Sequence, residues 1–168
     1  MKRMFGLAIA VVVVVSLTHI GNFGNSSIYA APQAESDKRV IEQLFAAWNS
    51  DDPDKVVASF TEDIVYEDVA ASHISRGRAE VRKWVAGAFA DIENFKLEVV
   101  SSSFHNGRGV VEWVWSGTDK GLLKTGKNFS VRGVSVIEVR GGKISRYKEF
   151  YDFATVMRQL GLLPAEKE

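Results

Sequence analysis

Two turn dipeptides in the second half of the chain constrain the fold more than any other feature of the sequence. Asn106-Gly107 and Gly141-Gly142 supply residues that tolerate positive φ angles, which the tight turn of a β-hairpin requires. Segments of alternating apolar and polar residues flank both dipeptides. We predict strands over 95–99, 110–116, 129–139 and 143–151. The second half of the chain is therefore expected to form an antiparallel sheet.

The first half of the domain has helical periodicity instead. Apolar residues recur three and four positions apart in two segments, and Asp52-Pro53 is typical of the start of a short helix between them. We predict helices over 36–50, from Pro53 onward, over 78–91 and over 153–160.

One short strand interrupts these helices, over Ile64 to Val69. It places Tyr66 and Asp68 on the same face as Ile64, and a loop containing His73 follows. Helices followed by a run of strands indicate an α+β fold, in which helices cover one face of a strongly bent sheet.

The N-terminal segment has the layout of a secretory signal peptide. Lys2 and Arg3 precede an apolar run that is shorter than the roughly 20 residues of a membrane-spanning helix. We predict a signal peptide over 1–30, a linker over 31–35, one domain over 36–164 and a tail over 165–168. The protein is then secreted or periplasmic and not attached to a membrane after processing; the alternative is an uncleaved anchor.

Composition removes several classes of function. The 168 residues carry 21 basic and 21 acidic side chains, so no excess of positive charge favours nucleic acid as a partner. Cysteine is absent, which excludes disulfides and thiolate metal sites. Beyond the predicted signal peptide the only histidines are His73 and His105, which do not form a metal-binding pair, so we predict no metal site.

What remains is acid-base chemistry in an aromatic cavity. Trp113 and Trp115 lie on one face of their strand, and other aromatic residues are expected to surround the same space. A carboxyl group in such a cavity has a raised pKa and transfers protons near neutral pH. The candidate ligand-pocket residues are Trp48, Phe89, Trp113, Trp115, Phe129, Arg132, Tyr147, Glu149 and Tyr151.

The polar candidates have alternative roles that the sequence leaves open. Asp152 stands just before the terminal helix and is either its N-cap or a pocket carboxylate. Strand alternation separates Asp152 from Glu149, so only one of the two faces the pocket without a bulge. Glu149 and Arg132 also suit a surface ion pair, and His73 is either exposed or a proton shuttle.

A set of short motifs resembles the SnoaL-like polyketide cyclase family of the nuclear transport factor 2 like superfamily. In chain order they are Trp115-Ser116-Gly117-Thr118, Thr125-Gly126-Lys127, Val131-Arg132-Gly133, Gly142-Lys143-Ile144 and Tyr151-Asp152. The resemblance implies a cone-shaped, curved antiparallel sheet wrapped around helices, the cystatin-like α+β barrel. It also implies a pocket inside the cone, no cofactor and a homodimer.

The resemblance further implies roles for individual residues. Asp152 matches the family's general acid/base. Independently of the resemblance, an acid-base enzyme would use Tyr66, Asp68 or His73 as the hydrogen-bond donor to a developing oxyanion, and these are the other candidate catalytic residues. Where the family often has a pocket histidine, this chain has Asp119.

Three hypotheses of function follow. The first is a cofactor-free enzyme that cyclises, isomerises or hydrates a small hydrophobic carbonyl compound. The second is a non-catalytic binding module for a small apolar ligand. The third is a scaffold dimer whose own side chains fill the cavity, and the cavity volume distinguishes it, because ligand sites normally exceed about 300 Å³.

Overall fold

The computed structural model describes residues 26–164, with the side chains of Ser36 and of residues 38–164. Most of the predicted signal peptide and the whole predicted tail lie outside the described residues. Within residues 26–164, no helix is both long enough and apolar enough to cross a membrane.

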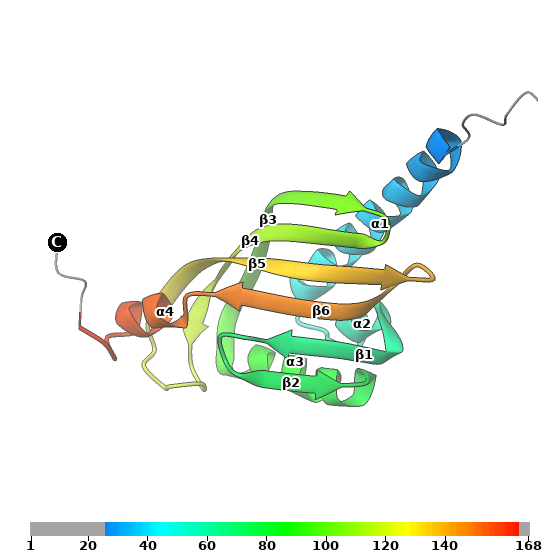
Figure 1. Ribbon diagram of the computed structural model, residues 1–168. Helices are drawn as coiled ribbons and strands as arrows, with labels where there is room; N and C mark the ends of the chain where they lie inside the picture. The colour runs from blue at the N-terminus through cyan, green and yellow to red at the C-terminus, as the bar shows by residue number, and fades with distance from the viewer. Residues whose placement is uncertain (1–25, 165–168) are drawn as a thin grey trace, which may run out of the picture.

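A single curved sheet of six strands forms the body of the molecule, in the order β2-β1-β6-β5-β4-β3 (Figure 1). Neighbouring strands run antiparallel, except that β1 and β6 are parallel. The strands are β1 (Phe60–Asp68), β2 (His73–Arg76), β3 (Ile92–His105), β4 (Arg108–Asp119), β5 (Asn128–Arg140) and β6 (Lys143–Tyr151).

Three helices lie on one face of this sheet, and a fourth lies at the end of β6 (Figure 1). They are α1 (Ser26–Trp48), α2 (Pro53–Ala58), α3 (Arg78–Asp91) and α4 (Phe153–Gln159). The Asp52 side chain accepts hydrogen bonds from the first turn of α2, as its N-cap position predicted. Helix α1 begins ten residues before the predicted start at Ser36, so the predicted linker over 31–35 is helical.

Both hairpin turns are confirmed. Asn106, Gly107, Gly141 and Gly142 have φ angles of 50°, 73°, 59° and 72°. Each pair supplies two consecutive residues in the left-handed region, which matches the twist of the flanking strands. These turns join β3 to β4 and β5 to β6.

The expected loop around His73 was wrong, because His73 begins strand β2 and pairs with Asp68 of β1. The turn between the two strands contains no glycine or asparagine. Ser72 adopts a φ of 53°, and the Asp68 side chain accepts a hydrogen bond from the Ala71 N–H at 2.8 Å. A turn stabilised by these two residues lacks the usual hairpin signals of the sequence.

Register shifts bend the sheet into a half-cone. They occur between Glu93 and Lys96 and between Val99 and Ser101 on β3, and at Glu138 on β5. Such irregularities increase strand twist and curvature. The concave face packs on α1, α2 and α3 around fully buried residues that include Leu44, Ile64 and Val85.

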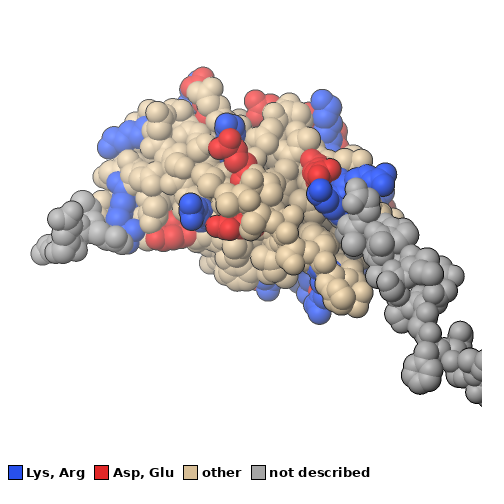
Figure 2. Space-filling model, turned by 90° about the horizontal axis from the view of Figure 1, so that it is seen from above, with Lys and Arg blue, Asp and Glu red and all other residues tan. Residues whose placement is uncertain are grey.

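Charged residues are distributed over the surface in both signs. On the face shown in Figure 2, basic and acidic side chains stand in small mixed groups. Many of them are paired, for example Arg82 with Asp54 at 2.7 Å and Lys148 with Glu67 at 2.7 Å. This distribution agrees with the balanced composition and forms no basic field on that face.

Candidate active site

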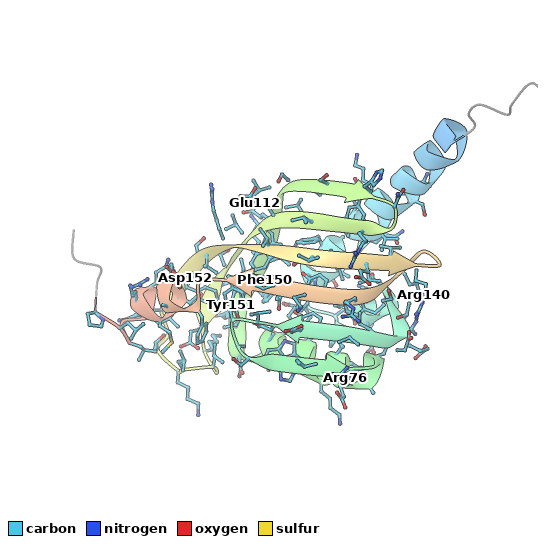
Figure 3. The ribbon with its side chains drawn as sticks, viewed as in Figure 1. Arg76, Glu112, Arg140, Phe150, Tyr151 and Asp152 are labelled. Atoms are coloured by element: carbon cyan, nitrogen blue, oxygen red, sulfur yellow. The ribbon has the colours of Figure 1, made fainter. Side chains whose placement is uncertain are left out.

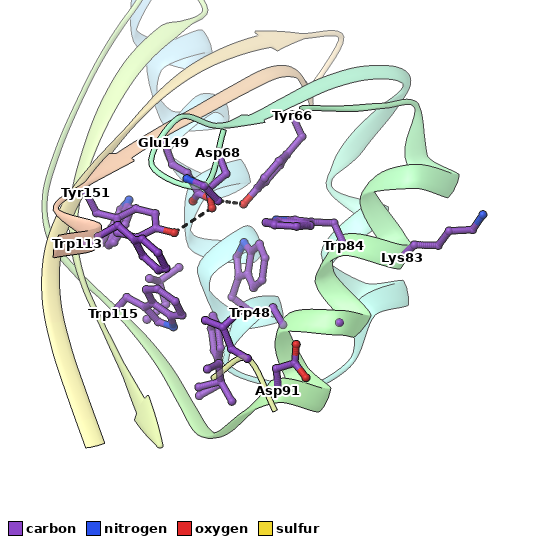
Figure 4. Close-up of a pocket in the computed structure, with 18 residues that line it drawn as sticks. Trp48, Tyr66, Asp68, Lys83, Trp84, Asp91, Trp113, Trp115, Glu149 and Tyr151 are labelled. Carbon is purple, nitrogen blue, oxygen red and sulfur yellow. Dashed lines mark hydrogen bonds between the residues drawn. The ribbon is translucent and has the colours of Figure 1, made fainter. Parts of the chain in front are cut away.

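A cavity of about 220 Å³ lies between the concave face of the sheet and helices α1 and α3 (Figure 4). Eight of its 18 lining residues are aromatic. The Asp68 and Glu149 carboxyl groups lie where β1 and β6 end, and the charged residues Lys83 and Asp91 belong to α3. The lining residues are Trp48, Tyr66, Asp68, Ala71, Lys83, Trp84, Gly87, Ala88, Asp91, Ile92, Phe95, Leu97, Trp113, Trp115, Leu122, Glu149, Tyr151 and Phe153.

Strand register brings the two carboxyl groups together. Asp68 of β1 is the direct partner of Glu149 on the parallel strand β6, and Tyr66 is the partner of Tyr147. Neighbouring strands are about 4.8 Å apart, and alternate residues share a face. Asp68 and Glu149 therefore stand side by side at one end of the cavity.

The Glu149 carboxyl group is held in place by the side chain of Tyr66. The Tyr66 hydroxyl donates a hydrogen bond to Glu149 Oε1, and the Tyr66 ring stacks on Tyr147 at a centroid distance of 5.0 Å. Burial, together with the neighbouring negative charge of Asp68, raises the pKa of Glu149 from its ordinary 4.5 to about 8. At neutral pH Glu149 is mainly protonated and is a hydrogen-bond donor.

Asp68 is held by donors of a different kind. The Ala71 N–H and the Tyr151 hydroxyl donate to its two oxygens at 2.8 and 3.0 Å. Burial raises the pKa of Asp68 above its usual value, while these two donors and the nearby His73 oppose the rise. Because Asp68 has more donors than Glu149, it is the carboxyl of the pair that carries the charge.

A buried chain of hydrogen bonds holds Tyr147, the residue on which the Tyr66 ring stacks. The Trp113 indole N–H donates to Ser135 Oγ at 2.8 Å, and the Ser135 hydroxyl donates to the Tyr147 oxygen at 2.7 Å. All three residues are at most 2% exposed. Tyr147 is thereby fixed as the platform on which Tyr66 stacks.

Helix α3 supplies the opposite wall, and Phe89 was the only residue of this helix predicted to line the pocket. Residues 83, 84, 87, 88 and 91 lie on one helix face because they are spaced three and four apart. Trp84 is the aromatic member of this face and was missed as a pocket residue. The same spacing was visible in the sequence, but it does not distinguish a helix face that packs from one that lines a cavity.

Gly87 leaves room in that wall, because a Cβ built at this position meets no atom within 4 Å. We expect Gly87→Ala to raise the free energy of unfolding by about 0.5–1 kcal/mol, since alanine is the better residue inside a helix. Chemical denaturation measures this change in the free energy of unfolding.

A larger side chain at the same position tests where a ligand binds. The leucine side chain of Gly87→Leu is expected to occupy the cavity and to weaken binding of a small ketone such as cyclohexanone. Unchanged binding would place the ligand elsewhere.

Asp152 does not line the cavity, and the prediction of Asp152 as a pocket base is corrected. It is the N-cap of α4: the Thr155 N–H donates to its carboxylate at 3.1 Å and the Thr155 hydroxyl at 2.6 Å. Its side chain is 57% exposed, and these hydrogen bonds lower its pKa. With no bulge at the end of β6, Tyr147, Glu149 and Tyr151 share the inner face of the strand, and Phe150 is on the outer face. Figure 3 shows Phe150, Tyr151 and Asp152 in succession where β6 meets α4.

This placement predicts that Asp152 matters for stability and not for chemistry. Asp152→Ala is expected to lower the midpoint of thermal unfolding by a few degrees, because the first turn of α4 loses its cap. Asp152→Asn is the matched control, since asparagine caps equally well. Differential scanning calorimetry measures both, and a loss of ligand binding in Asp152→Asn would contradict the assignment.

Four other predicted pocket residues lie outside the cavity wall. Arg132 lies on the outer face of β5, and its side chain is 77% exposed. Its Nη1 is 3.9 Å from Glu112 Oε1, so its ion-pair partner is Glu112 and not the predicted Glu149. Phe129 is buried, and its ring meets that of Trp115 at 4.6 Å. Phe89 packs on Trp48 at 5.7 Å, and Tyr147 lies behind Tyr66. Each supports the wall from behind or belongs to the opposite face of the sheet.

His73 is beside the cavity and not in its wall. Its ring stacks on Trp84 at a centroid distance of 3.7 Å, and Nε2 is 2.8 Å from Ser75 Oγ. The proton-shuttle alternative therefore has no direct route to a ligand, although His73 influences Asp68 electrostatically.

Asp119 organises a loop. It stands at the position where the SnoaL-like polyketide cyclase family, which the sequence resembles, often has a pocket histidine. Its carboxylate accepts hydrogen bonds from the Leu123 N–H at 2.9 Å and from the Thr125 N–H and hydroxyl at 2.8 Å. Asp119 is fully buried and absent from the cavity wall. Its three hydrogen bonds hold the loop that carries Leu122 to the cavity.

Among the residues that the structure describes, no three or more histidine, aspartate or glutamate side chains are grouped to hold a metal ion. At the end of β1 and β6 the cavity presents one protonated and one ionised carboxyl group, Glu149 and Asp68, and α3 adds Lys83 and Asp91 to the wall. The cavity volume of about 220 Å³ is below the roughly 300 Å³ that normally marks a ligand site, so the volume by itself does not separate the scaffold hypothesis from the other two. A ligand enclosed here is small, with one side near the two carboxyl groups.

Comparison with solved structures identifies the fold. A protein with a ketosteroid isomerase-like fold from Catenulispora acidiphila, in complex with trimethylamine, superposes with a TM-score of 0.69 and 26% identity over 74% of this chain and 93% of that one. An LEH-like epoxide hydrolase from M. tuberculosis superposes with a TM-score of 0.65 and 19% sequence identity, covering 77% of this chain and 92% of that chain. An NTF2-like protein from Burkholderia thailandensis superposes with a TM-score of 0.66 and 20% sequence identity, covering 76% of this chain and 98% of that chain.

These similarities confirm the predicted nuclear transport factor 2 like α+β fold. The sequence also matches the family defined by the SnoaL-like domain over residues 41–147, which is more than half of the chain. This match includes helix α3, both hairpin turns and the strand that carries Tyr66 and Asp68. The chain therefore belongs to the SnoaL-like domain family.

Proposed function

We propose that this protein is an exported, cofactor-free acid-base enzyme that isomerises or cyclises a small hydrophobic carbonyl compound through its enol. The observation that carries the proposal is the pair of carboxyl groups, Asp68 and Glu149, in direct register inside an aromatic cavity. Two adjacent carboxyl groups with different hydrogen-bond partners divide into a base and an acid. Asp68 is the base and Glu149 the acid.

The proposed step moves two protons. The Asp68 carboxylate takes the proton from the carbon next to the carbonyl group, and the C–H electron pair becomes the carbon–carbon double bond of the enol. Glu149 gives its proton to the carbonyl oxygen, assisted by the Tyr66 hydroxyl. The carboxyl pair has one negative charge before and after the step, so no additional charge is buried.

This assignment gives a pH dependence. The step needs Asp68 ionised and Glu149 protonated, so turnover is expected to fall above pH of about 8, where Glu149 loses its proton. The assay needs no knowledge of the natural substrate: the protein is incubated with cyclohexanone in D₂O, and the exchange of the protons next to the carbonyl is followed by proton NMR. Exchange that is no faster than in buffer across a panel of small ketones would contradict the proposal.

A non-catalytic binding module is the second candidate, favoured by the number of tryptophans in the cavity wall. Trp48, Trp84, Trp113 and Trp115 line the cavity together with the Asp68 carboxylate. Aromatic rings and a carboxylate bind alkylammonium ions, and the Catenulispora relative was solved in complex with trimethylamine. Calorimetric binding of trimethylammonium, without proton exchange on any ketone, would favour this candidate.

A second copy of the chain is the proposed partner. Val110, Val134, Val136 and Phe150 form an exposed apolar patch on the outer face of the sheet, in which Val110 pairs with Val136 and Val134 with Phe150. Arg132 and Glu112 border it with charges of opposite sign, which suits a two-fold interface. Light scattering is expected to give a dimer, and Val136→Lys a monomer.

A further inference from the structure

The loop of residues 120–127, between β4 and β5, carries two leucines that face solvent beside the mouth of the cavity. Leu122 and Leu123 are 44% and 37% exposed, and Leu122 also lines the cavity. The exposed residues of a cavity wall mark its opening. In this cavity they are Ala71, Lys83, Gly87 and Leu122. The 120–127 loop therefore borders the entrance to the candidate site.

The outside of the same loop is basic. Lys120, Lys124 and Lys127 are all exposed. Lys120 pairs with Glu93 at 2.5 Å, whereas Lys124 and Lys127 form no ion pair within residues 26–164. The Asp119 carboxylate at the start of the loop is buried, so its charge does not reach solvent. The loop thus presents two apolar side chains between cationic ones.

Hydrogen bonds fix the shape of the loop. The Asp119 carboxylate holds its far half through Leu123 and Thr125. The carbonyl oxygen of Asp91 accepts hydrogen bonds from the N–H groups of Lys120 and Gly121 at 2.8 and 2.9 Å. A surface that is already ordered loses little conformational entropy when it binds a partner.

A second pair of exposed leucines adjoins the loop. Leu162 and Leu163 follow α4 and are 45% and 41% exposed. They come directly after Gly161, which lies against the Lys127 side chain: a Cβ built at Gly161 would be 2.3 Å from Lys127 Nζ. In Figure 1 the loop and α4 lie at the same end of the molecule. Exposed leucines and unpaired lysines therefore gather at the end where the cavity opens.

This combination fits the surface of an anionic bilayer. Leucine side chains enter the boundary between headgroups and acyl chains, while lysines extend to the lipid phosphates. We propose that the 120–127 loop docks on a bilayer that contains anionic lipids, with the cavity mouth turned toward the membrane. The contact is peripheral and reversible, and it is made by the folded domain, unlike the uncleaved anchor considered from the sequence.

Docking in this orientation gives the ligand a direct path. A ketone dissolved in the bilayer reaches the cavity past Leu122 without crossing bulk water. This consequence, that the ligand is a membrane-soluble compound, rests on the proposed function. The docking itself depends only on the exposed leucines and lysines.

The absence of cysteine from the chain allows a direct test. A polarity-sensitive fluorophore is attached to Leu123→Cys, and the protein is mixed with phosphatidylcholine vesicles that contain or lack phosphatidylglycerol. The emission is expected to shift to shorter wavelength only with phosphatidylglycerol present, and less so in high salt. Val100→Cys is the matched control, because Val100 is also exposed but lies on β3. No shift at position 123, or equal shifts at both positions, would overturn the proposal.

Substitutions distinguish a lipid surface from other partners. Sedimentation with phosphatidylglycerol vesicles is expected to weaken at least about fivefold in Lys124→Glu, and by a similar factor in Leu123→Ser. Lys38→Glu is the matched control for charge, because Lys38 is an exposed residue of α1, and its binding is expected to be unchanged.

Two results of these substitutions would overturn the proposal. If Lys124→Glu weakens binding and Leu123→Ser does not, the contact is purely ionic and suits a soluble polyanion instead. If Leu123→Ser has a smaller mass than wild-type protein in light scattering, the leucines contact a second copy of the chain.

The docking and the proposed reaction fail separately. Wild-type protein that binds phosphatidylglycerol vesicles but exchanges no ketone protons retains the docking surface and loses the reaction. Protein that exchanges ketone protons in solution, without a shift at position 123 on vesicles, retains the reaction and loses the docking.

Discussion

Replacing Glu149 by glutamine is expected to slow ketone proton exchange by about 10²–10⁴-fold, the usual contribution of a positioned acid or base. Glutamine keeps the shape of the side chain and can still accept the Tyr66 hydrogen bond, but it cannot transfer a proton. The measurement is the initial rate of deuterium incorporation into cyclohexanone, followed by proton NMR at neutral pH.

The matched control for this variant is Glu98→Gln. Glu98 is an exposed residue of β3 whose carboxylate pairs with Lys96 at 2.7 Å. Its substitution is expected to leave the exchange rate unchanged. An equal rate in Glu149→Gln and wild-type protein, with both folded, would remove Glu149 from the reaction and leave the binding module as the better hypothesis.

The stability of the folded protein is expected to fall as the pH rises from about 4.5 to about 8. The pKa of Glu149 rises from an ordinary 4.5 to about 8 on folding, so the folded state holds its proton more tightly than the unfolded state. The contribution is complete below pH 4.5 and is lost as the pH passes through 8. Solvent at the open side of the cavity reduces the effect, and we expect about 2–3 kcal/mol.

Urea unfolding at several pH values measures this slope, and Glu149→Gln is the variant that isolates it. With a neutral side chain at position 149, most of the fall between pH 4.5 and 8 is expected to disappear. Aspartates with a lowered pKa, such as Asp152, act below this window and do not interfere. A slope of the same size in wild-type protein and in the variant would show that Glu149 has an ordinary pKa.

Local sequence patterns determined most of the fold. The two turn dipeptides require positive φ angles that few other residue pairs adopt, and both hairpins lie where they predicted. The Asp52-Pro53 start of α2 and the apolar spacing of α3 depend on interactions within one helical turn. The turn after Asp68 was missed, because a side chain and Ser72 stabilise it without a glycine.

The alternation of side chains along a strand already shows that two of the predicted pocket residues cannot both be correct. Phe129 and Arg132 are three positions apart on one strand, so they cannot both face the cavity unless a bulge lies between them. The structure shows none there, and Arg132 is outside. The same rule left a choice between Glu149 and Asp152, which the sequence alone could not make.

The sequence by itself determined which residues form hairpins, helices and caps, because those depend on neighbours in the chain. Only the tertiary structure decided that Glu149 and not Asp152 meets Asp68, since the pairing of β1 with β6 joins segments about 80 residues apart. It also decided that helix α3 lines a cavity and that, within residues 26–164, the Trp48 and Trp115 indole N–H groups are buried without a hydrogen-bond partner. Enclosure, desolvation and unmet hydrogen bonds depend on packing between distant segments, and no local pattern encodes them.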